Sequence, residues 1–255
     1  TSSLSVERMT EGLKNPERVV GFHFFNPVAV MPLLEVARTS TTDDATTATA
    51  IAVGKELKKT MIICKDAPGF VVNRLLTRFM GEVTDAVDEG TSPAVADAAM
   101  MEIGFPMSPF QLLDLVGPGV ALHVSETLHN NLGPRYRISP TMQRMVKDGV
   151  RNFYIKSEDG VVSANPAALA LIEKGTTPST AEQVRSRALK ALAEEARMML
   201  DEGVVTTAAE IDLCMLMGAG WPMHLGGILP YLDREGISES VTGKRFHDKG
   251  VASLP

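Results

Sequence analysis

The 255-residue sequence is poor in cysteine and carries no basic excess. Its two cysteines, Cys64 and Cys214, lie far apart in apolar surroundings, so neither a disulfide framework nor a metal-ligand spacing is present. We therefore expect buried thiols in a reducing compartment, the cytoplasm. The formal net charge is −6 and no run of lysine and arginine stands out, which argues against nucleic acid as the main partner.

Long apolar runs are missing as well. No stretch approaches the length of a membrane-spanning helix, and no signal-peptide pattern opens the chain. A glycine fingerprint for dinucleotide phosphates is also absent. Gly117-Pro118-Gly119 continues to Leu122 where a third glycine is required, and Gly218-Ala219-Gly220 continues to Met223. We expect the sequence to be a piece of a longer protein, with any such fingerprint upstream of Thr1.

The most informative stretch is the string VVGFHFFNPVAVMPLLEV. It predicts two apolar strands, at 19–25 and 33–36, joined by a turn that contains Asn26-Pro27. His23 falls in the first strand and Glu35 in the second. A carboxylate beside a histidine in a dry site fixes its tautomer and favours the protonated ring, which is how a general base is built. The alternative is a hydrogen-bonded core histidine and a carboxylate facing water.

The rest of the chain predicts an α/β segment followed by an all-helical one. A helix at 41–58, acidic at its start and basic at its end, leads to a strand at 60–64. With the two earlier strands, this pattern is typical of the end of a doubly wound, Rossmann-type sheet. After the turn at 66–69 almost everything is helical, and residues 152–179 are expected to be mostly linker. Helices are expected at 6–13, 70–90, 95–103, 110–116, 120–132, 141–147 and 167–174.

The helical part repeats itself. Asn73-Arg74-Leu75-Leu76, running to Asp88, corresponds to Ser186-Arg187-Ala188-Leu189, running to Asp201, with a constant shift of 113 (201 − 88). Glycine–aromatic–Pro-Met strings follow both copies, at 104–107 and 220–223. The sequence therefore predicts two duplicated helical domains. The expected domains are 1–65 (sheet), 66–155 (first helical copy) and 156–255 (linker and second copy).

Three strings in order carry a resemblance to a known family: TSSLS at the start, HFFNPV followed by Glu35 twelve residues after His23 (35 − 23), and KDAPGFVVNRLL at 65–76. This pattern resembles the 3-hydroxyacyl-CoA dehydrogenase family, and the resemblance covers nearly the whole chain. It implies NAD-dependent oxidation of (3S)-3-hydroxyacyl-CoA to 3-ketoacyl-CoA in fatty-acid β-oxidation. An acyl-CoA is then the substrate.

The resemblance also implies roles for single residues. His23 is the base and Glu35 its partner. Ser2 and Asn73 are expected to donate hydrogen bonds to the substrate oxygen. Ser2 and Asn26 are expected near the NAD cofactor, whose main binding motif would lie upstream of this chain.

The duplication resembles the multifunctional α-subunit of fatty-acid β-oxidation. That implies upstream Rossmann and enoyl-CoA hydratase domains, and a thiolase subunit as a candidate partner. On its own, this piece is expected to be inactive. Two alternatives remain open: a non-catalytic helical dimerisation module that keeps the ancestral string, and a related dehydrogenase that acts on a small hydroxy acid.

Overall fold

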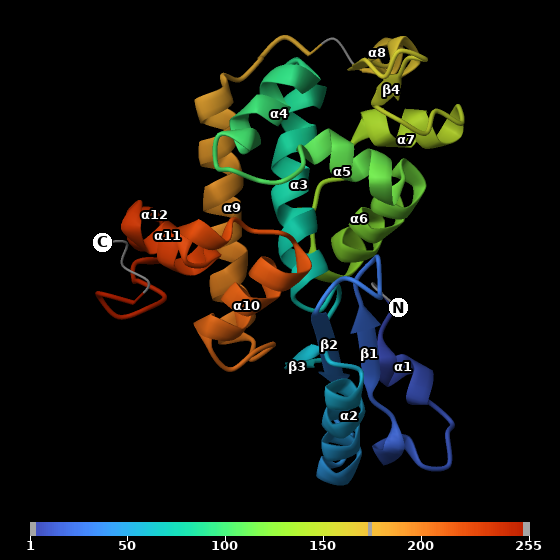
Figure 1. Cartoon of the computed structure of the whole chain (residues 1–255), viewed down its shortest axis with the longest axis vertical. Helices are drawn as coiled ribbons and strands as arrows, with labels where there is room; N and C mark the ends of the chain where they lie inside the picture. The colour runs from blue at the N-terminus through green and yellow to red at the C-terminus, as the bar shows by residue number, and fades with distance from the viewer. Residues whose placement is uncertain (1–3, 173–174, 252–255) are drawn as a thin grey trace. The chain divides into compact units, whose positions relative to one another are not determined.

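The structure, a computed structural model, describes residues 4–172 and 175–251. The chain forms two compact units (Figure 1). The first unit combines residues 1–76 with residues 193–255, and the second is residues 77–192. The first unit therefore unites the two ends of the chain.

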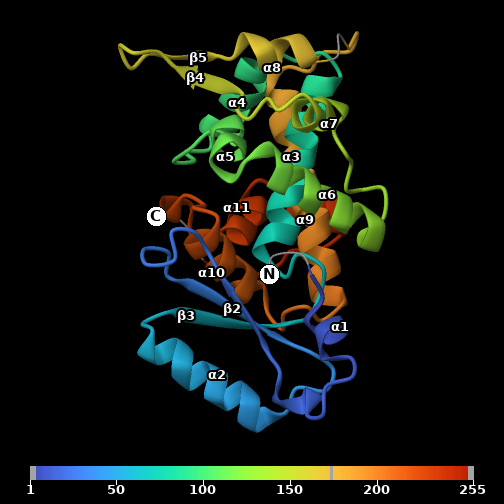
Figure 2. The ribbon, with the colours of Figure 1, turned by 90° about the vertical axis from the view of Figure 1, so that its right-hand side faces the viewer.

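A three-stranded sheet organises the described part of the first unit. Its strands lie in the order β1 (Gly21–Phe24), β2 (Leu33–Arg38) and β3 (Thr60–Lys65), with β1 antiparallel and β3 parallel to β2. Helix α2 (Asp44–Glu56) packs on one face and helix α10 (Ala208–Gly218) on the other (Figure 2). Because both faces are covered, the central strand is buried along nearly its whole length.

The two faces of β2 pack differently. Leu34 and Val36 pack with Ala50 of α2 in an apolar cluster. On the opposite face α10 approaches closely, because a Cβ atom at Gly218 would lie only 2.6 Å from the side chain of Leu33. Alternation along the strand thus assigns Leu33 and Glu35 to the face that α10 covers.

Short helices complete the first unit. Helix α1 begins at its cap Ser5, whose hydroxyl accepts a hydrogen bond from the N–H of Arg8, and a capping box of Thr207 and Glu210 starts α10. These short elements are α1 (Val6–Thr10), η1 (Pro16–Arg18), η2 (Met223–Leu225), α11 (Ile228–Arg234) and α12 (Ile237–Thr242). Two long helices, α3 (Val72–Asp88) and α9 (Ala181–Asp201), contribute to both units.

Serine–proline pairs start three helices of the second unit. The hydroxyls of Ser92, Ser108 and Ser139 each accept a hydrogen bond from the backbone of the first turn, and proline follows each at the first helical position. The elements of this unit, besides parts of α3 and α9, are α4 (Pro93–Met101), α5 (Pro109–Val116), α6 (Pro118–Leu132), α7 (Pro140–Lys147), β4 (Tyr154–Lys156), β5 (Val162–Ala164) and α8 (Pro166–Leu171).

Two expectations were wrong in detail. The linker predicted at 152–179 contains the β4–β5 hairpin, whereas the helix expected at 167–174 is present as α8. Strands of three residues are too short to show an alternating pattern, so no strand was predicted there. The long helix predicted to begin at Phe70 begins at Val72, because Phe70 adopts a left-handed backbone with φ of 49°.

The two thiols are buried, as their apolar surroundings in the sequence predict. Cys64 and Cys214 are buried, and burial raises the pKa of both thiols. None of the helices in the described residues combines the length and apolar character needed to cross a bilayer. Within 4–172 and 175–251, no cluster of histidine, cysteine and carboxylate side chains suits a metal ion.

Candidate active site

The register of β1 and β2 brings His23 and Glu35 directly opposite one another. Nδ1 of His23 lies 2.5 Å from Oε2 of Glu35. Both side chains are buried, with relative exposures of 8% and 0%. The carboxylate accepts at Nδ1, so this nitrogen carries the hydrogen and Nε2 is the nitrogen able to take up a proton. The predicted pairing of the two residues is thus present in the structure.

The second oxygen of Glu35 is held by the start of α3. The backbone N–H groups of Val71 and Val72 donate to Oε1 at 3.1 and 2.9 Å. These groups have no partner inside the helix, and they lie at the positive end of a 17-residue helix dipole. A buried carboxylate is costly unless it is hydrogen-bonded, and this arrangement supplies those bonds.

Two aromatic rings contact His23. The ring of Phe25 lies 4.6 Å from the imidazole, centroid to centroid, in an edge-on arrangement at 62°. The ring of Phe70 lies 5.4 Å away at 49°. Both phenylalanines are buried. Packing of this kind restricts rotation of the imidazole and lets it keep one orientation.

The other predicted site residues have different outcomes. Asn73 lies in the first turn of α3, directly after Val72, and is half-buried. Asn26 is exposed just beyond the end of β1. Ser2 lies outside the described residues.

Sequence reasoning missed an ion-pair network next to Asn73. Arg74 is fully buried and its Nε donates to Oε1 of Glu195 at 2.6 Å, while its terminal nitrogens donate to Glu202 at 2.7 and 3.0 Å. Glu195 is also fully buried. The network ties the first turn of α3 to α9. Glu195 and Glu202 fall in the second copy that the sequence predicts. The repeat alone, however, does not indicate that these two residues contact Arg74.

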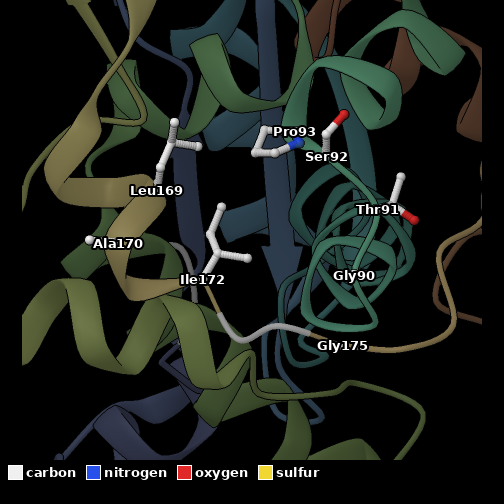
Figure 3. Close-up of a pocket in the computed structure, with 8 residues that line it drawn as sticks. All are labelled: Gly90, Thr91, Ser92, Pro93, Leu169, Ala170, Ile172 and Gly175. Carbon is white, nitrogen blue, oxygen red and sulfur yellow. The ribbon is translucent and has the colours of Figure 1, made fainter.

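A separate hollow of about 380 Å³ lies in the second unit (Figure 3). It opens between the start of α4, at Ser92 and Pro93, and the end of α8, at Leu169 and Ile172. None of the residues predicted for catalysis lines it. The dyad, Asn73 and the Arg74 network all belong to the first unit.

Comparisons with protein families agree with this geometry. The model of the 3-hydroxyacyl-CoA dehydrogenase NAD-binding domain matches residues 1–67, and that of the 3-hydroxyacyl-CoA dehydrogenase C-terminal domain matches residues 69–162. The two matches are the two domains of an NAD-binding dehydrogenase. The chain belongs to the 3-hydroxyacyl-CoA dehydrogenase family.

Curated relatives point the same way. The chain is 32% identical to the fatty acid oxidation complex subunit alpha of Vibrio cholerae, over 97% of this chain and 36% of that protein. It is 34% identical to the protein of the same name from Acinetobacter baylyi, over 94% of this chain and 36% of that protein. The chain thus spans just over a third of the length of these relatives.

Solved structures give the same fold. A 3-hydroxybutyryl-CoA dehydrogenase from Escherichia coli superposes with a TM-score of 0.72 over 99% of this chain and 73% of that one, at 23% identity. The (S)-3-hydroxybutyryl-CoA dehydrogenase PaaH1 from Ralstonia eutropha superposes with a TM-score of 0.57 at 35% identity, over 60% of this chain and 55% of that one.

Proposed function

We propose that the complete protein oxidises (3S)-3-hydroxyacyl-CoA to 3-ketoacyl-CoA in fatty-acid β-oxidation, with His23 as the base. The observation that carries this proposal is the buried contact of 2.5 Å between His23 and Glu35. Oxidation of a secondary alcohol releases a proton and a hydride from the same C–OH group, and a positioned base must take the proton. NAD, when bound, accepts the hydride.

The chain's own residues have distinct tasks in this scheme. Nε2 of His23 takes the hydroxyl proton as the C–H bond breaks, and the imidazolium later releases it to solvent. Glu35 holds the ring through Nδ1 and offsets the charge that forms on it. We propose that Asn73 and Ser2 donate hydrogen bonds to the substrate oxygen, because neutral donors stabilise developing negative charge without competing as bases.

In our proposal, most of the residues that bind the cofactor lie outside this chain. A pyrophosphate is held by backbone N–H groups at a glycine-rich strand-to-helix turn, and the sequence contains no such pattern. The residues in the NAD-binding-domain match therefore supply the catalytic edge of that domain. Of the two expected cofactor contacts, Asn26 is exposed and so accessible to a ligand, and Ser2 stays a prediction.

The chain's relatives suggest a larger assembly. Because the chain covers 36% of proteins named fatty acid oxidation complex subunit alpha, we propose that it is the dehydrogenase part of such a subunit. The upstream part would then include the rest of the Rossmann domain and an enoyl-CoA hydratase domain. The word "complex" in that name supports a partner subunit, and a thiolase that cleaves the 3-ketoacyl-CoA product is our candidate.

The duplicated helical domains remain part of the proposal, as segments 66–155 and 156–255 after the sheet segment 1–65. A second ion-pair network supports them. Arg187 donates through Nε to Glu82 at 3.1 Å and through a terminal nitrogen to Glu89 at 2.5 Å. Each member lies 113 residues from its counterpart in the Arg74 network (187 − 74, 195 − 82 and 202 − 89). The same atoms of the two arginines make the equivalent bonds.

The test is the substitution His23→Gln in the complete protein. We expect the rate of 3-hydroxyacyl-CoA oxidation to fall by about 10²–10⁴, the usual contribution of a general base, with little change in NAD affinity. His129→Gln is the matched control, because His129 is half-buried and its Nδ1 is hydrogen-bonded to the carbonyl of Tyr136 at 2.7 Å.

The outcomes separate the competing functions. Wild-type turnover in His23→Gln would contradict catalysis by this dyad and favour a helical dimerisation module. Turnover of a free small hydroxy acid, with none of the acyl-CoA, would favour the related dehydrogenase.

A further inference from the structure

The turn before α3 is unusual in its backbone. Gly69 and Phe70 are consecutive residues with positive φ, at 74° and 49°. Glycine adopts this conformation freely, but it is strained for a residue with a side chain. Phe70 is one of two non-glycine residues with positive φ in the described chain, and the other, Lys58, lies at the end of α2. Strain of this kind persists only where the surroundings enforce it, and it clusters at functional sites.

The strained turn has a direct geometric consequence. The left-handed step at Gly69 and Phe70 ends where the helix begins, and the next two N–H groups, of Val71 and Val72, converge on one oxygen of Glu35. The other oxygen of that carboxylate bonds His23. The backbone of the turn therefore sets the position of Glu35, and Glu35 sets the orientation of the imidazole.

The side chain of Phe70 acts on the same histidine. It is 2% exposed, and its ring lies 5.4 Å from the imidazole. One residue thus reaches His23 by two routes, directly through its ring and indirectly through the N–H groups that follow it. Phe25 reaches His23 only through its ring and has no positive φ. The difference between the two phenylalanines separates the routes.

We infer that Phe70 is a positioning residue for the proposed base: its left-handed backbone aims the start of α3 at Glu35 and so fixes the His23–Glu35 dyad. This inference rests on the proposed function of His23. Phe70 itself touches no reacting atom in this account. Its effect on the reaction passes through Glu35 and His23.

A backbone role and a packing role of Phe70 predict opposite orders of activity for two substitutions, Phe70→Gly and Phe70→Val. Glycine keeps the left-handed turn but leaves the largest cavity, whereas the β-branched valine fills more of the space but cannot adopt positive φ without strain. If the backbone is decisive, Phe70→Gly is the better enzyme and Phe70→Val the worse one. If only packing matters, the order is reversed.

The experiment measures kcat, KM and the pH profile of 3-hydroxyacyl-CoA oxidation in the complete protein. We expect kcat of Phe70→Val to fall by about 10- to 100-fold, the usual result of misplacing a catalytic group by about 1 Å, and to fall further than in Phe70→Gly. KM should change little, because the residue is buried and acts on the base instead of on the substrate. The acid limb of the pH profile should shift in Phe70→Val as it does in Glu35→Gln.

Phe25 provides the control pair. Phe25→Val should retain more activity than Phe25→Gly, since its backbone is ordinary and only its ring contacts His23. Hydrogen–deuterium exchange of the peptide that contains Val71 and Val72 gives a readout independent of activity. Exchange should be faster in Phe70→Val and in Glu35→Gln, and close to wild type in Phe25→Val.

Two results would overturn the inference. One is equal or better activity in Phe70→Val than in Phe70→Gly, and the other is unchanged exchange at Val71 and Val72 in Phe70→Val. Failure of the proposed function has a different signature, namely wild-type turnover in His23→Gln. If Phe70→Val does not fold, Gly69→Ala tests the same backbone, because alanine at φ of 74° is strained while the Phe70 ring is kept.

Discussion

In the first helical segment, two aspartates tie consecutive helices to the strand that follows them. Asp97 of α4 accepts from the N–H of Phe110 at 3.0 Å and from the hydroxyl of Tyr154 at 2.5 Å. Asp114 of α5 accepts from the N–H groups of Phe153 and Tyr154 at 2.6 and 2.9 Å. These carboxylates therefore fix the first turn of α5 and the start of β4 from within the helices.

The second helical segment uses the same scheme. Asp212 of α10 accepts from the N–H of Leu229 at 2.8 Å and lies 2.7 Å from Nε2 of His247. Asp233 of α11 accepts from the N–H groups of Phe246 and His247 at 3.0 and 2.9 Å. In both segments two helices joined by a turn are followed, later in the chain, by a pair of residues that the aspartates bind. The pair is Phe153-Tyr154 in the first segment and Phe246-His247 in the second.

The comparison teaches where the two segments diverge. Both segments contain such aspartate and arginine contacts, whereas the groups suited to chemistry differ. Asn73 corresponds to Ser186, and no histidine–glutamate string precedes the second segment. Arg74 is fully buried next to the turn that holds Glu35, whereas the side chain of Arg187 is 31% exposed. We therefore expect a single active site, built on the first copy, with the second as scaffold.

The largest expected effect concerns the two arginines. Arg74→Gln breaks a fully buried ion pair with Glu195, so it should cost about 3–5 kcal/mol of unfolding free energy in the unit that contains it. Arg187→Gln breaks ion pairs that are already partly exposed to water and should cost about 1 kcal/mol or less. Thermal or urea unfolding of the complete protein measures both. Equal losses would remove the distinction between a buried and a half-exposed network.

The next effect separates the copies by activity. Asn73→Ala removes a proposed donor to the substrate oxygen and should lower kcat by about 10²–10³. Ser186→Ala, at the matching position of the second copy, should leave turnover near wild type. Steady-state kinetics on both variants decides the question. A comparable loss in Ser186→Ala would contradict the scaffold role of the second copy.

A smaller pair of changes probes the aspartate contacts of the two segments. His247→Ala removes one of the two partners of buried Asp212 and should cost about 1–3 kcal/mol, whereas His247→Tyr installs the residue of the first copy and should restore most of that loss. Tyr154→Phe, which removes the hydroxyl bond to Asp97, provides the parallel loss in the first copy. Unfolding midpoints compare the variants. If His247→Tyr does not restore stability, the Asp97–Tyr154 and Asp212–His247 contacts are not equivalent.

The smallest effect is a pH dependence at a position where the two copies differ. Burial raises the pKa of Asp85 to about 7, although Arg137 lies 3.1 Å away, and the matching residue in the second copy is Met198. Between about pH 4 and 7 the folded state then binds more protons than the unfolded state, so stability falls as pH rises through that window. Asp85→Asn should make this fall smaller. Unfolding midpoints at pH 5 and 8 test it, with Met198→Leu as the control that keeps it.

The sequence predicted the parts of the molecule that follow from local chemistry. Serine before proline marks the start of α4 and α5 because the hydroxyl and the fixed φ act on the nearest turn. His23 and Glu35 were predicted to pair because two short strands joined by a turn place such residues across from each other.

What could not be predicted depends on contacts distant in the sequence. A phenylalanine gives no sign of a left-handed backbone, so the true start of α3 and the N–H groups aimed at Glu35 were not foreseen. The partners of Arg74 lie more than a hundred residues away, and only the folded chain shows which glutamates meet it. The β4–β5 hairpin is too short to produce a pattern.

The central claim is that His23 and Glu35 act as one base. The most direct measurement is the pH–rate profile of 3-hydroxyacyl-CoA oxidation by the complete protein, in wild type and in Glu35→Gln. An imidazolium without its carboxylate is less stable, so the account predicts an acid limb displaced to lower pH and a smaller loss of maximal rate than in His23→Gln. Superimposable profiles with equal maximal rates would contradict it.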